Sequence, residues 1–477
     1  MRFQIDKVQA DGHWVPLTDH RTSDNIDNAF TLIVGQNAVG KSRLLRKIVS
    51  NYIFSQENRT KSSTKSDDFY SPNFRPNQNR VSRYMKGASS YGKVDESFAY
   101  HSWYDSSSYN SEVRTSLYSS SVPSNVIAVS TGRHDRFPSV AHLRNKELIA
   151  EYRYIGTDQF SKNSIPSSLI SLLEGLLQGK QNLQKLSHIF EYLGFAPYLD
   201  IKLSFNQKEF SNLTQQELHA LQYNTKQPLL DFFINEETIF YNPYSETPTF
   251  FEELKNRSKS NVQIDFWDHS INLQTHIISD LLPFLKSGIV KISDITLITL
   301  IGKSRMRLSQ ASSGQQCMLT IMLGIAGAIK NGSLICIDEP EISLHPQWQS
   351  NMVKQLQEVF SDFSGCHFVI ATHSPQIVSG LISENGYVLN LEEKALYHSF
   401  DYAKRSADFQ LAEVFHTPGQ NNEYLLRVAL LLLTKLSRRE KLAREDHENL
   451  RMLVTVRKNM SEADPVYHLI GQVEALF

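Results

Sequence analysis

The sequence contains little cysteine, no excess of charge of either sign and no long uninterrupted apolar run. Its three cysteines, Cys317, Cys336 and Cys366, lie in or beside apolar stretches, which is typical of reduced thiols and argues against a disulfide or zinc framework. The 49 lysines and arginines nearly balance the 50 aspartates and glutamates, so contact with nucleic acid would need a local basic patch. The longest apolar run, residues 425–436, is interrupted by two basic residues and is too short to span a bilayer. Residues 1–10 alternate like a strand and do not read as a signal peptide, so we expect a cytoplasmic protein with no membrane contact.

An apolar strand followed by two carboxylates is predicted within residues 334–346, which read LICIDEPEISLHP. A continuous apolar run is what a strand covered on both faces of a parallel sheet requires. Asp338 and Glu339 follow it, and ionised carboxylates at that position need cations or polar partners. Mg²⁺ accepts carboxylate oxygens beside nucleotide phosphates, which favours Asp338 as a metal ligand and leaves Glu339 to polarise a water. The alternative is that Asp-Glu-Pro only ends the strand and opens a turn.

A phosphate-binding loop is predicted at residues 35–42, where GQNAVGKS follows an apolar strand and precedes a helix. The segment fits the pattern G-x-x-x-x-G-K followed by Ser or Thr, in which glycines let successive N–H groups turn toward a phosphate. We expect Lys41 to reach the β- and γ-phosphates of ATP and the Ser42 hydroxyl to join the Mg²⁺ shell, while the helix dipole favours the same anion. The predicted nucleotide contacts in this segment are Gly35, Gln36, Asn37, Ala38, Val39, Gly40, Lys41, Ser42 and Arg43.

A Ser/Gly turn at residues 312–315 precedes a strongly apolar helix. Free N–H groups and the helix dipole make such a turn a second candidate for anion binding, although an ordinary N-cap is the alternative. His373 follows a predicted strand at residues 368–371, and an imidazole there can hydrogen-bond a γ-phosphate or a water. A second strand, residues 126–129, is followed by His134, Asp135 and Arg136, which could face the nucleotide or make an ordinary turn.

Two regions between these motifs have a different character. Residues 55–122 are crowded with Ser, Tyr and Asn, which predicts a largely irregular insertion. Basic and aromatic residues interleave there between residues 74 and 91, as in nucleic-acid contacts or in a charged linker. Helical spacing of Leu, Ile and Phe at residues 167–194 and 252–287 predicts a mainly helical lobe. Two short strands, at about 289–292 and 296–301, are expected to lead back to the core.

Taken in order, GQNAVGKS, ASSGQQ, LICIDEPE, SLHP and ATHS resemble the Walker A, signature, Walker B, D-loop and switch-histidine elements of ABC-type ATPases. The arrangement is similar to the SMC, RecF and OLD branch and not to transporter subunits. With VIAVSTGRHDRFP, EYRYIGTD and AEVFHTPGQNNEYLL, the chain most resembles PtuA, the ATPase of Septu-type and some retron-linked antiphage systems. It departs from the pattern at Ser313, where many relatives carry glycine, and in the lack of a recognisable Q-loop glutamine. The Toprim nuclease of the OLD family is not recognised after ATHS.

The resemblance implies that ATP is bound between two protomers of a homodimer or a higher homo-oligomer, with the phosphate loop of one chain facing the signature turn of the other. In that family the ATPase works with PtuB, a separately encoded HNH nuclease. A retron reverse transcriptase with its RNA and DNA, or another nucleic acid, is a further possible partner. The predicted catalytic residues are Lys41, Glu339 and His373, the Mg²⁺ ligands are Ser42 and Asp338, and the signature contacts are Ser312, Gly314 and Gln315.

The expected fold is α/β: an ABC-type P-loop ATPase head with an inserted, mainly helical lobe and a helical C-terminal region. The predicted parts are the head at 1–54, 123–160 and 288–404, a flexible insertion at 55–122, the helical lobe at 161–287 and the C-terminal region at 405–477. Three functions compete: an ATPase that regulates a partner nuclease in antiphage defence, a DNA repair or recombination ATPase of the RecF/SMC type, and a nucleotide-stabilised scaffold with little turnover.

Overall fold

The computed structural model describes most of the chain in separate ranges. They are residues 2–10, 13–19, 27–36, 39–63, 82–83, 98–104, 110–116, 122–132, 137–138, 152–156, 165–177, 183–205, 259–267, 270–271, 282, 285 and 290–477. Within these ranges the strands form three sheets.

The central sheet has seven strands in the order β17-β16-β3-β15-β14-β7-β8. All neighbours from β16 to β8 run parallel, and β17 joins the edge as an antiparallel hairpin partner. The five inner strands are buried along their whole length, which explains why they appear in the sequence as continuous apolar runs. The bounds are β3 Ala29–Val34, β7 Val126–Ser130, β8 Tyr152–Ile155, β14 Leu334–Asp338, β15 His367–Ala371, β16 Gly386–Asn390 and β17 Ala395–His398.

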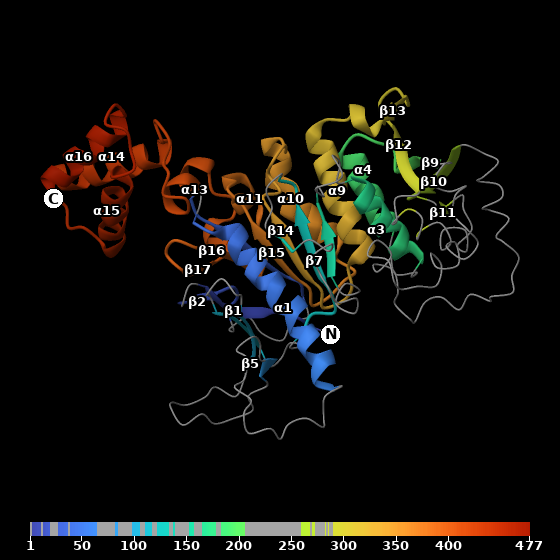
Figure 1. The fold of residues 1–477 in the computed structure, drawn as a ribbon. Coiled ribbons are helices and arrows are strands. Elements are labelled where there is room, and N and C mark those ends of the chain that lie inside the picture. The colour runs from blue at the N-terminus through green and yellow to red at the C-terminus, as the bar shows by residue number, and fades with distance from the viewer. Residues whose placement is uncertain are drawn as a thin grey trace, which may run out of the picture.

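Alternate residues of these strands pack into two cores, one on each face of the sheet. Ile33 and Cys336 pack with helix α1 (Lys41–Ser63), while Leu32 and Ile337 pack with helices on the opposite face. Figure 1 shows α1 lying along one face of the sheet. The opposite face carries α3 (Ile165–Leu177), α4 (Leu183–Tyr192), α9 (Ser313–Ala328), α10 (Pro346–Val359) and α11 (Pro375–Gly380).

A second sheet of five strands lies on the outer side of α1, in the order β2-β1-β6-β5-β4. Its strand β1 was predicted from the alternation of residues 1–10, but β4, β5 and β6 fall inside residues 55–122, where an irregular insertion was expected. That prediction is wrong for these residues, because β6 pairs with β1 and gives the segment a template for strand formation. Helix α1 also continues past residue 55. The bounds are β1 Ile5–Ala10, β2 His13–Pro16, β4 Ser82–Arg83, β5 Phe98–Tyr104 and β6 Asn110–Ser116.

The third sheet, in the order β11-β10-β9-β12-β13, is antiparallel and follows α4. The helix predicted over 252–287 is therefore wrong where β10 lies, because Val262, Ile264 and Phe266 are buried with a period of two. The two short strands predicted near 289–301 are one strand, β12, which continues through a bulge between Ile292 and Asp294. The bounds are β9 Tyr198–Phe205, β10 Lys259–Asp265, β11 Ser270–Ile271, β12 Val290–Ile298 and β13 Arg305–Arg307.

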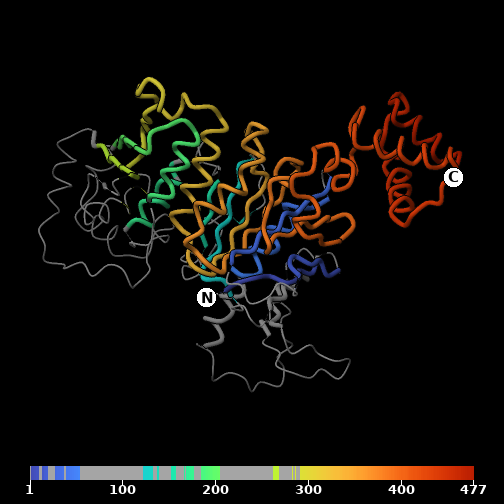
Figure 2. The backbone as a smooth tube through the Cα atoms, turned by 180° about the vertical axis from the view of Figure 1, so that it is seen from behind, coloured from blue at the N-terminus to red at the C-terminus, as the bar shows by residue number. Residues whose placement is uncertain are grey.

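The last part of the chain is helical. After α12 (Ser399–Tyr402) and α13 (Ala407–Glu413), the helices α14 (Glu423–Ser437), α15 (Arg444–Arg457) and α16 (Pro465–Leu476) form a separate apolar core. Seen from behind in Figure 2, they lie at the end of the molecule opposite the third sheet. Among the helices in the described part of the chain, none combines the length and apolarity that crossing a bilayer requires.

Candidate nucleotide site

The carboxyl ends of three neighbouring strands bring the central motifs together. In the order β3-β15-β14, Ala371 pairs with both Ile33 and Asp338. The segments that leave these strands are the phosphate loop after β3, His373 after β15 and Glu339 after β14. Open parallel sheets bind ligands at this edge, so the topology alone explains why motifs far apart in sequence share one site.

The phosphate loop has the backbone that its glycines permit, with φ of +150° at Gly35 and +109° at Gly40. Lys41 opens α1 and is 5% exposed, and its Nζ donates to the carbonyls of Gly35, at 2.8 Å, and Gln36, at 3.1 Å. Burial lowers the pKa of Lys41 to about 8, although the carboxylates of Glu339, Glu341, Asp338 and Glu392 oppose the shift. The ammonium therefore lies in the mouth of the loop. Val39, Ser42 and Arg43 flank it, whereas Asn37 and Ala38 lie outside the described residues.

A hydroxyl and a carboxylate lie side by side at the start of α1 and the end of β14. The Ser42 Oγ donates to Asp338 Oδ1 at 3.0 Å, and Asp338 is 4% exposed. Within the described ranges no group of three or more His, Cys, Asp or Glu side chains could hold a metal ion. Mg²⁺ at nucleotide sites takes one or two carboxylates and fills its other positions with water and phosphate oxygens. The pair of Ser42 and Asp338 fits that ligand set.

Glu339 follows Asp338 in a left-handed backbone conformation, with φ of +48°. Its N–H donates to Ala371 O at 3.0 Å and its carbonyl accepts from Thr131 Oγ1 at 2.7 Å. A non-glycine residue held at positive φ by its surroundings is strained, and such positions cluster at functional sites. The carboxylate is partly exposed, so it can reach a water at the sheet edge.

His373 lies between Lys41 and Glu339. Burial, followed by the nearby Lys41 charge, lowers the pKa of His373 to about 4, so the ring is neutral near pH 7. Lys41 Nζ lies 3.2 Å from His373 Nδ1 and Glu339 Oε1 lies 3.8 Å from Nε2. A neutral ring that accepts from Lys41 at Nδ1 presents its Nε2–H to Glu339, and this contact is consequently not an ion pair at neutral pH.

Glu341 is a site residue that the sequence motifs did not reveal. It accepts hydrogen bonds from the His373 N–H, at 2.5 Å, and from Thr372 Oγ1, at 2.9 Å. Burial raises the pKa of Glu341. The available signal was a second glutamate two residues after Glu339, but its partners follow β15 and are distant in sequence.

The signature turn follows a short 3-10 helix, Leu308–Gln310, and most of its hydrogen bonds are made within the turn. Ser312 caps α9: its Oγ accepts from the Gln315 N–H at 3.2 Å, and the Ser312 N–H donates to Gln315 Oε1 at 2.9 Å. The Nε2 of Gln315 donates to Leu193 O at 2.9 Å. Ser312 is therefore an N-cap in this structure, and anion binding by the turn stays a prediction.

Close packing explains why residue 314 is a glycine. A Cβ at this position would lie 2.8 Å from Ser343 O and 2.9 Å from the Trp348 ring, so only glycine lets α9 start this close to the loop before α10.

Figure 1 shows the start of α9 beside β12 and β13, apart from the start of α1. The structure thus brings Lys41, Ser42, Asp338, Glu339 and His373 together but leaves the signature turn elsewhere in the same chain. His134, Asp135 and Arg136 lie outside the described residues.

Comparison with known proteins identifies an ATPase domain. Residues 141–378 match the family described as AAA ATPase domain, a segment that contains the signature turn, β14 and His373. The phosphate loop precedes that segment in sequence and joins it through the β3–β15 pairing. The prediction of an ATP-hydrolysing enzyme is confirmed at the level of this domain.

Two curated proteins are similar to the chain over part of its length. The retron Ec83 probable ATPase of Escherichia coli is 26% identical over 195 residues, which cover 37% of this chain and 34% of that protein. The retron Vc95 probable ATPase of Vibrio cholerae serotype O1 biovar El Tor is 28% identical over 156 residues, 29% of each chain. The chain therefore spans about a third of the length of the curated relatives it matches.

Proposed function

We propose that this protein hydrolyses ATP at the carboxyl edge of its central sheet and uses the reaction to control a partner nuclease in antiphage defence. The observation that carries the ATPase part is the convergence of Lys41, Ser42, Asp338, Glu339 and His373 from three strands onto one edge. Each of these side chains has the chemistry that phosphoryl transfer to water needs. A nucleotide-stabilised scaffold would need no carboxylate poised beside the phosphate loop.

In this proposal each side chain has one task. Ser42 and Asp338 would hold Mg²⁺, which when bound offsets charge on the phosphate oxygens. Lys41 places its ammonium against the γ-phosphate and exchanges its present carbonyl contacts for phosphate oxygens. Glu339 orients the attacking water and accepts its proton. The neutral His373 donates a hydrogen bond from Nε2 to the γ-phosphate or to a water. Glu341 fixes His373 through the backbone and acts only by positioning it.

A glutamine at position 339 tests the hydrolytic role. Glu339→Gln keeps the shape of the side chain but removes the basic carboxylate, so we expect ATP affinity to persist and kcat to fall on the order of 10²–10⁴. Glu384→Gln, at an exposed glutamate before β16, is the matched control. Hydrolysis by Glu339→Gln at the parental rate would remove Glu339 from the mechanism.

The separation of the signature turn from the phosphate loop supports a site shared between two copies of the chain. In that arrangement the start of α9 from one copy covers the nucleotide held by the other. A mixture of Lys41→Ala and Ser312→Arg chains should then regain activity, because one of the two composite sites would be intact. No gain above the separate variants, with subunit exchange demonstrated, would argue for a site within one chain.

The partner is proposed from the relatives and from the C-terminal helices. Two relatives are retron probable ATPases, which supports a retron-type setting. The HNH nuclease similar to PtuB is proposed from the resemblance of the sequence motifs to PtuA. The helix α14 exposes Leu426, Leu430 and Leu431, the last to 59%, and an exposed apolar patch of this kind marks interaction sites.

Co-purification tests this surface. Leu430→Asp together with Leu431→Asp should release a co-expressed HNH partner while folding and ATP hydrolysis persist. Thr434→Asp, at an exposed polar position of the same helix, is the control. Retention of the partner by the double variant would place its docking surface elsewhere.

A further inference from the structure

The turn between β16 and β17 contacts the phosphate loop directly. Glu392 follows β16, and its Oε1 accepts from the Gln36 N–H at 2.6 Å. The backbone pairing of β16 with β3 continues to this point, since the Leu391 N–H donates to Val34 O at 3.0 Å. A Cβ placed on Gly35 would lie 3.7 Å from Glu392 Oε1, so the carboxylate lies against the beginning of the loop.

The contact holds the Gln36 peptide from the side opposite to Lys41. In the trans peptide that joins Gly35 to Gln36, the Gly35 carbonyl accepts from Lys41 Nζ and the Gln36 N–H donates to Glu392, so the two contacts lie on opposite sides of this peptide. This amide is at the end of the loop that leaves β3, whereas the helix N-terminus at Gly40 and Lys41 is the end that attracts phosphate. The position favours an anchor of the loop over a stand-in for a phosphate.

Glu392 is itself held by a buried asparagine. Asn390 is 2% exposed, and its Oδ1 accepts from the backbone N–H groups of Glu392, at 3.0 Å, and Glu393, at 3.2 Å. Its Nδ2 donates to Val414 O at 3.1 Å and lies 3.4 Å from His416 Nε2. The turn therefore cannot move without disturbing the segment after α13.

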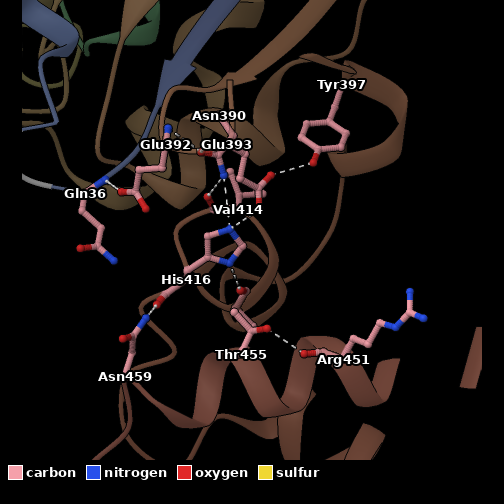
Figure 3. Close-up of polar contacts among 11 residues, drawn as sticks. Gln36, Asn390, Glu392, Glu393, Tyr397, Val414, His416, Arg451, Thr455 and Asn459 are labelled. Atoms are coloured by element: carbon pink, nitrogen blue, oxygen red, sulfur yellow. Dashed lines mark hydrogen bonds and ion pairs between the residues drawn. The ribbon is translucent and has the colours of Figure 1, made fainter. Parts of the chain in front are cut away.

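The same contacts lead on to the C-terminal helices (Figure 3). Glu393 Oε1 lies 2.8 Å from His416 Nε2, and the carbonyl of His416 accepts from Asn459 Nδ2 at 3.0 Å. Asn459 follows α15, and His416 has a left-handed backbone conformation with a φ of +49°. A continuous series of polar contacts thus joins Gln36 to the end of α15.

We infer that Glu392 is a positioning residue for the phosphate loop, and that Asn390, Glu393 and His416 connect it to the C-terminal helices, so that the placement of those helices sets the affinity for nucleotide. This inference rests on the proposed nucleotide site. It provides a route by which a partner bound at α14–α16 alters ATP binding without touching the catalytic groups.

Kinetics on the full chain test the anchor. Glu392→Ala should raise the KM for ATP about fivefold with kcat little changed, because an exposed charge-assisted hydrogen bond is lost. Glu392→Gln keeps an acceptor oxygen and should stay close to the parent, and Glu384→Ala serves as the control. Tighter nucleotide binding by Glu392→Ala would show a competing anion and overturn the inference, as would an unchanged KM.

Variants at the far end test the connection. His416→Asn tolerates the positive φ but removes the contact to Glu393, and Asn459→Ala removes the contact to the His416 carbonyl. Each variant should raise the KM for ATP about twofold. Either change combined with Glu392→Ala should raise the KM little further than Glu392→Ala alone, as expected for residues in one network. Full additivity of the paired changes would show that the two ends act independently.

Hydrogen exchange separates this inference from the proposed function. In the nucleotide-free chain, Glu392→Ala should speed amide exchange in the peptide that contains Gln36, while Glu384→Ala should not. If Glu392→Ala speeds this exchange but the protein binds no ATP, the anchoring role of Glu392 stands and the proposed function is wrong. If the exchange is unchanged while the protein binds and hydrolyses ATP, the proposed function stands and the anchoring role is wrong.

Discussion

The phosphate loop and the signature turn are both Ser/Gly turns before a helix, yet their polar groups are used differently. In the phosphate loop, Lys41, Ser42 and the Gln36 N–H have partners on β14, on the segment after β15 and on the β16–β17 turn. In the signature turn, Ser312 and Gln315 complete each other's hydrogen bonds within one helical turn. The first turn is assembled by the sheet, whereas the second caps its own helix and has one described polar contact outside that turn, from Gln315 Nε2 to Leu193 O.

This difference indicates which turn depends on tertiary structure. Four carboxylates and an imidazole act on Lys41, so a substitution there changes a network, while a substitution at Ser312 changes one cap. For the signature turn to bind an anion, either its cap must open or a second copy of the chain must bring the ligand to it. The predictions below address the two turns in order of expected effect.

The largest effect is expected at Lys41. Lys41→Ala removes the only ammonium in the mouth of the phosphate loop among the described residues, and ATP affinity should fall on the order of a hundredfold, since charge-assisted hydrogen bonds contribute most at such sites. Lys354→Ala, at an exposed lysine of α10, is the control. Equilibrium binding of a fluorescent ATP analogue measures the difference, and equal affinities would remove the loop from the nucleotide site.

Much of the first turn and its strands could be predicted from sequence, because each depends on a local pattern. Continuous apolar runs marked β3, β7, β14 and β15, and the glycine spacing marked the loop. Glu341 and Glu392 could not be found in this way, because their partners lie in segments distant in sequence that follow β15 and β3. In the third sheet β12 was predicted, as two short strands, whereas β10 was missed. This strand is short and alternating, and apolar residues around it gave a helical spacing that its buried face does not follow.

The next effect is expected in the packing of the signature turn. Gly314→Ala forces a methyl group within 2.8 Å of Ser343 O and 2.9 Å of the Trp348 ring. Overpacking of this kind costs about 1–3 kcal/mol, so the thermal midpoint should fall, and hydrolysis should fall with it if α9 contributes to a shared site. Ser313→Ala, at the exposed neighbour, should change neither. An unaltered midpoint for Gly314→Ala would show that the loop before α10 can yield.

A pH dependence should distinguish the phosphate loop from the signature turn, since only the first contains a titrating group. Burial lowers the pKa of Lys41 to about 8, and a lysine loses its positive charge as the pH rises through its pKa. ATP affinity should therefore weaken up to about tenfold between roughly pH 7 and 9. Lys41→Arg keeps its charge over this range, so its affinity, whatever its absolute value, should stay level. A parental affinity that does not change with pH would contradict the neutralisation of Lys41.

The smallest effect is expected at Ser312, and it decides whether the second turn does more than cap a helix. Ser312→Ala removes the oxygen that accepts from the Gln315 N–H and should cost about 1 kcal/mol of stability. Ser312→Asn supplies another favoured capping oxygen and should restore the thermal midpoint. If hydrolysis returns with stability, the serine is only a cap, and the comparison between the two turns stands as the structure shows it. If hydrolysis stays low while the fold is restored, the small hydroxyl itself meets a ligand, which in this chain requires the phosphate loop of a second copy.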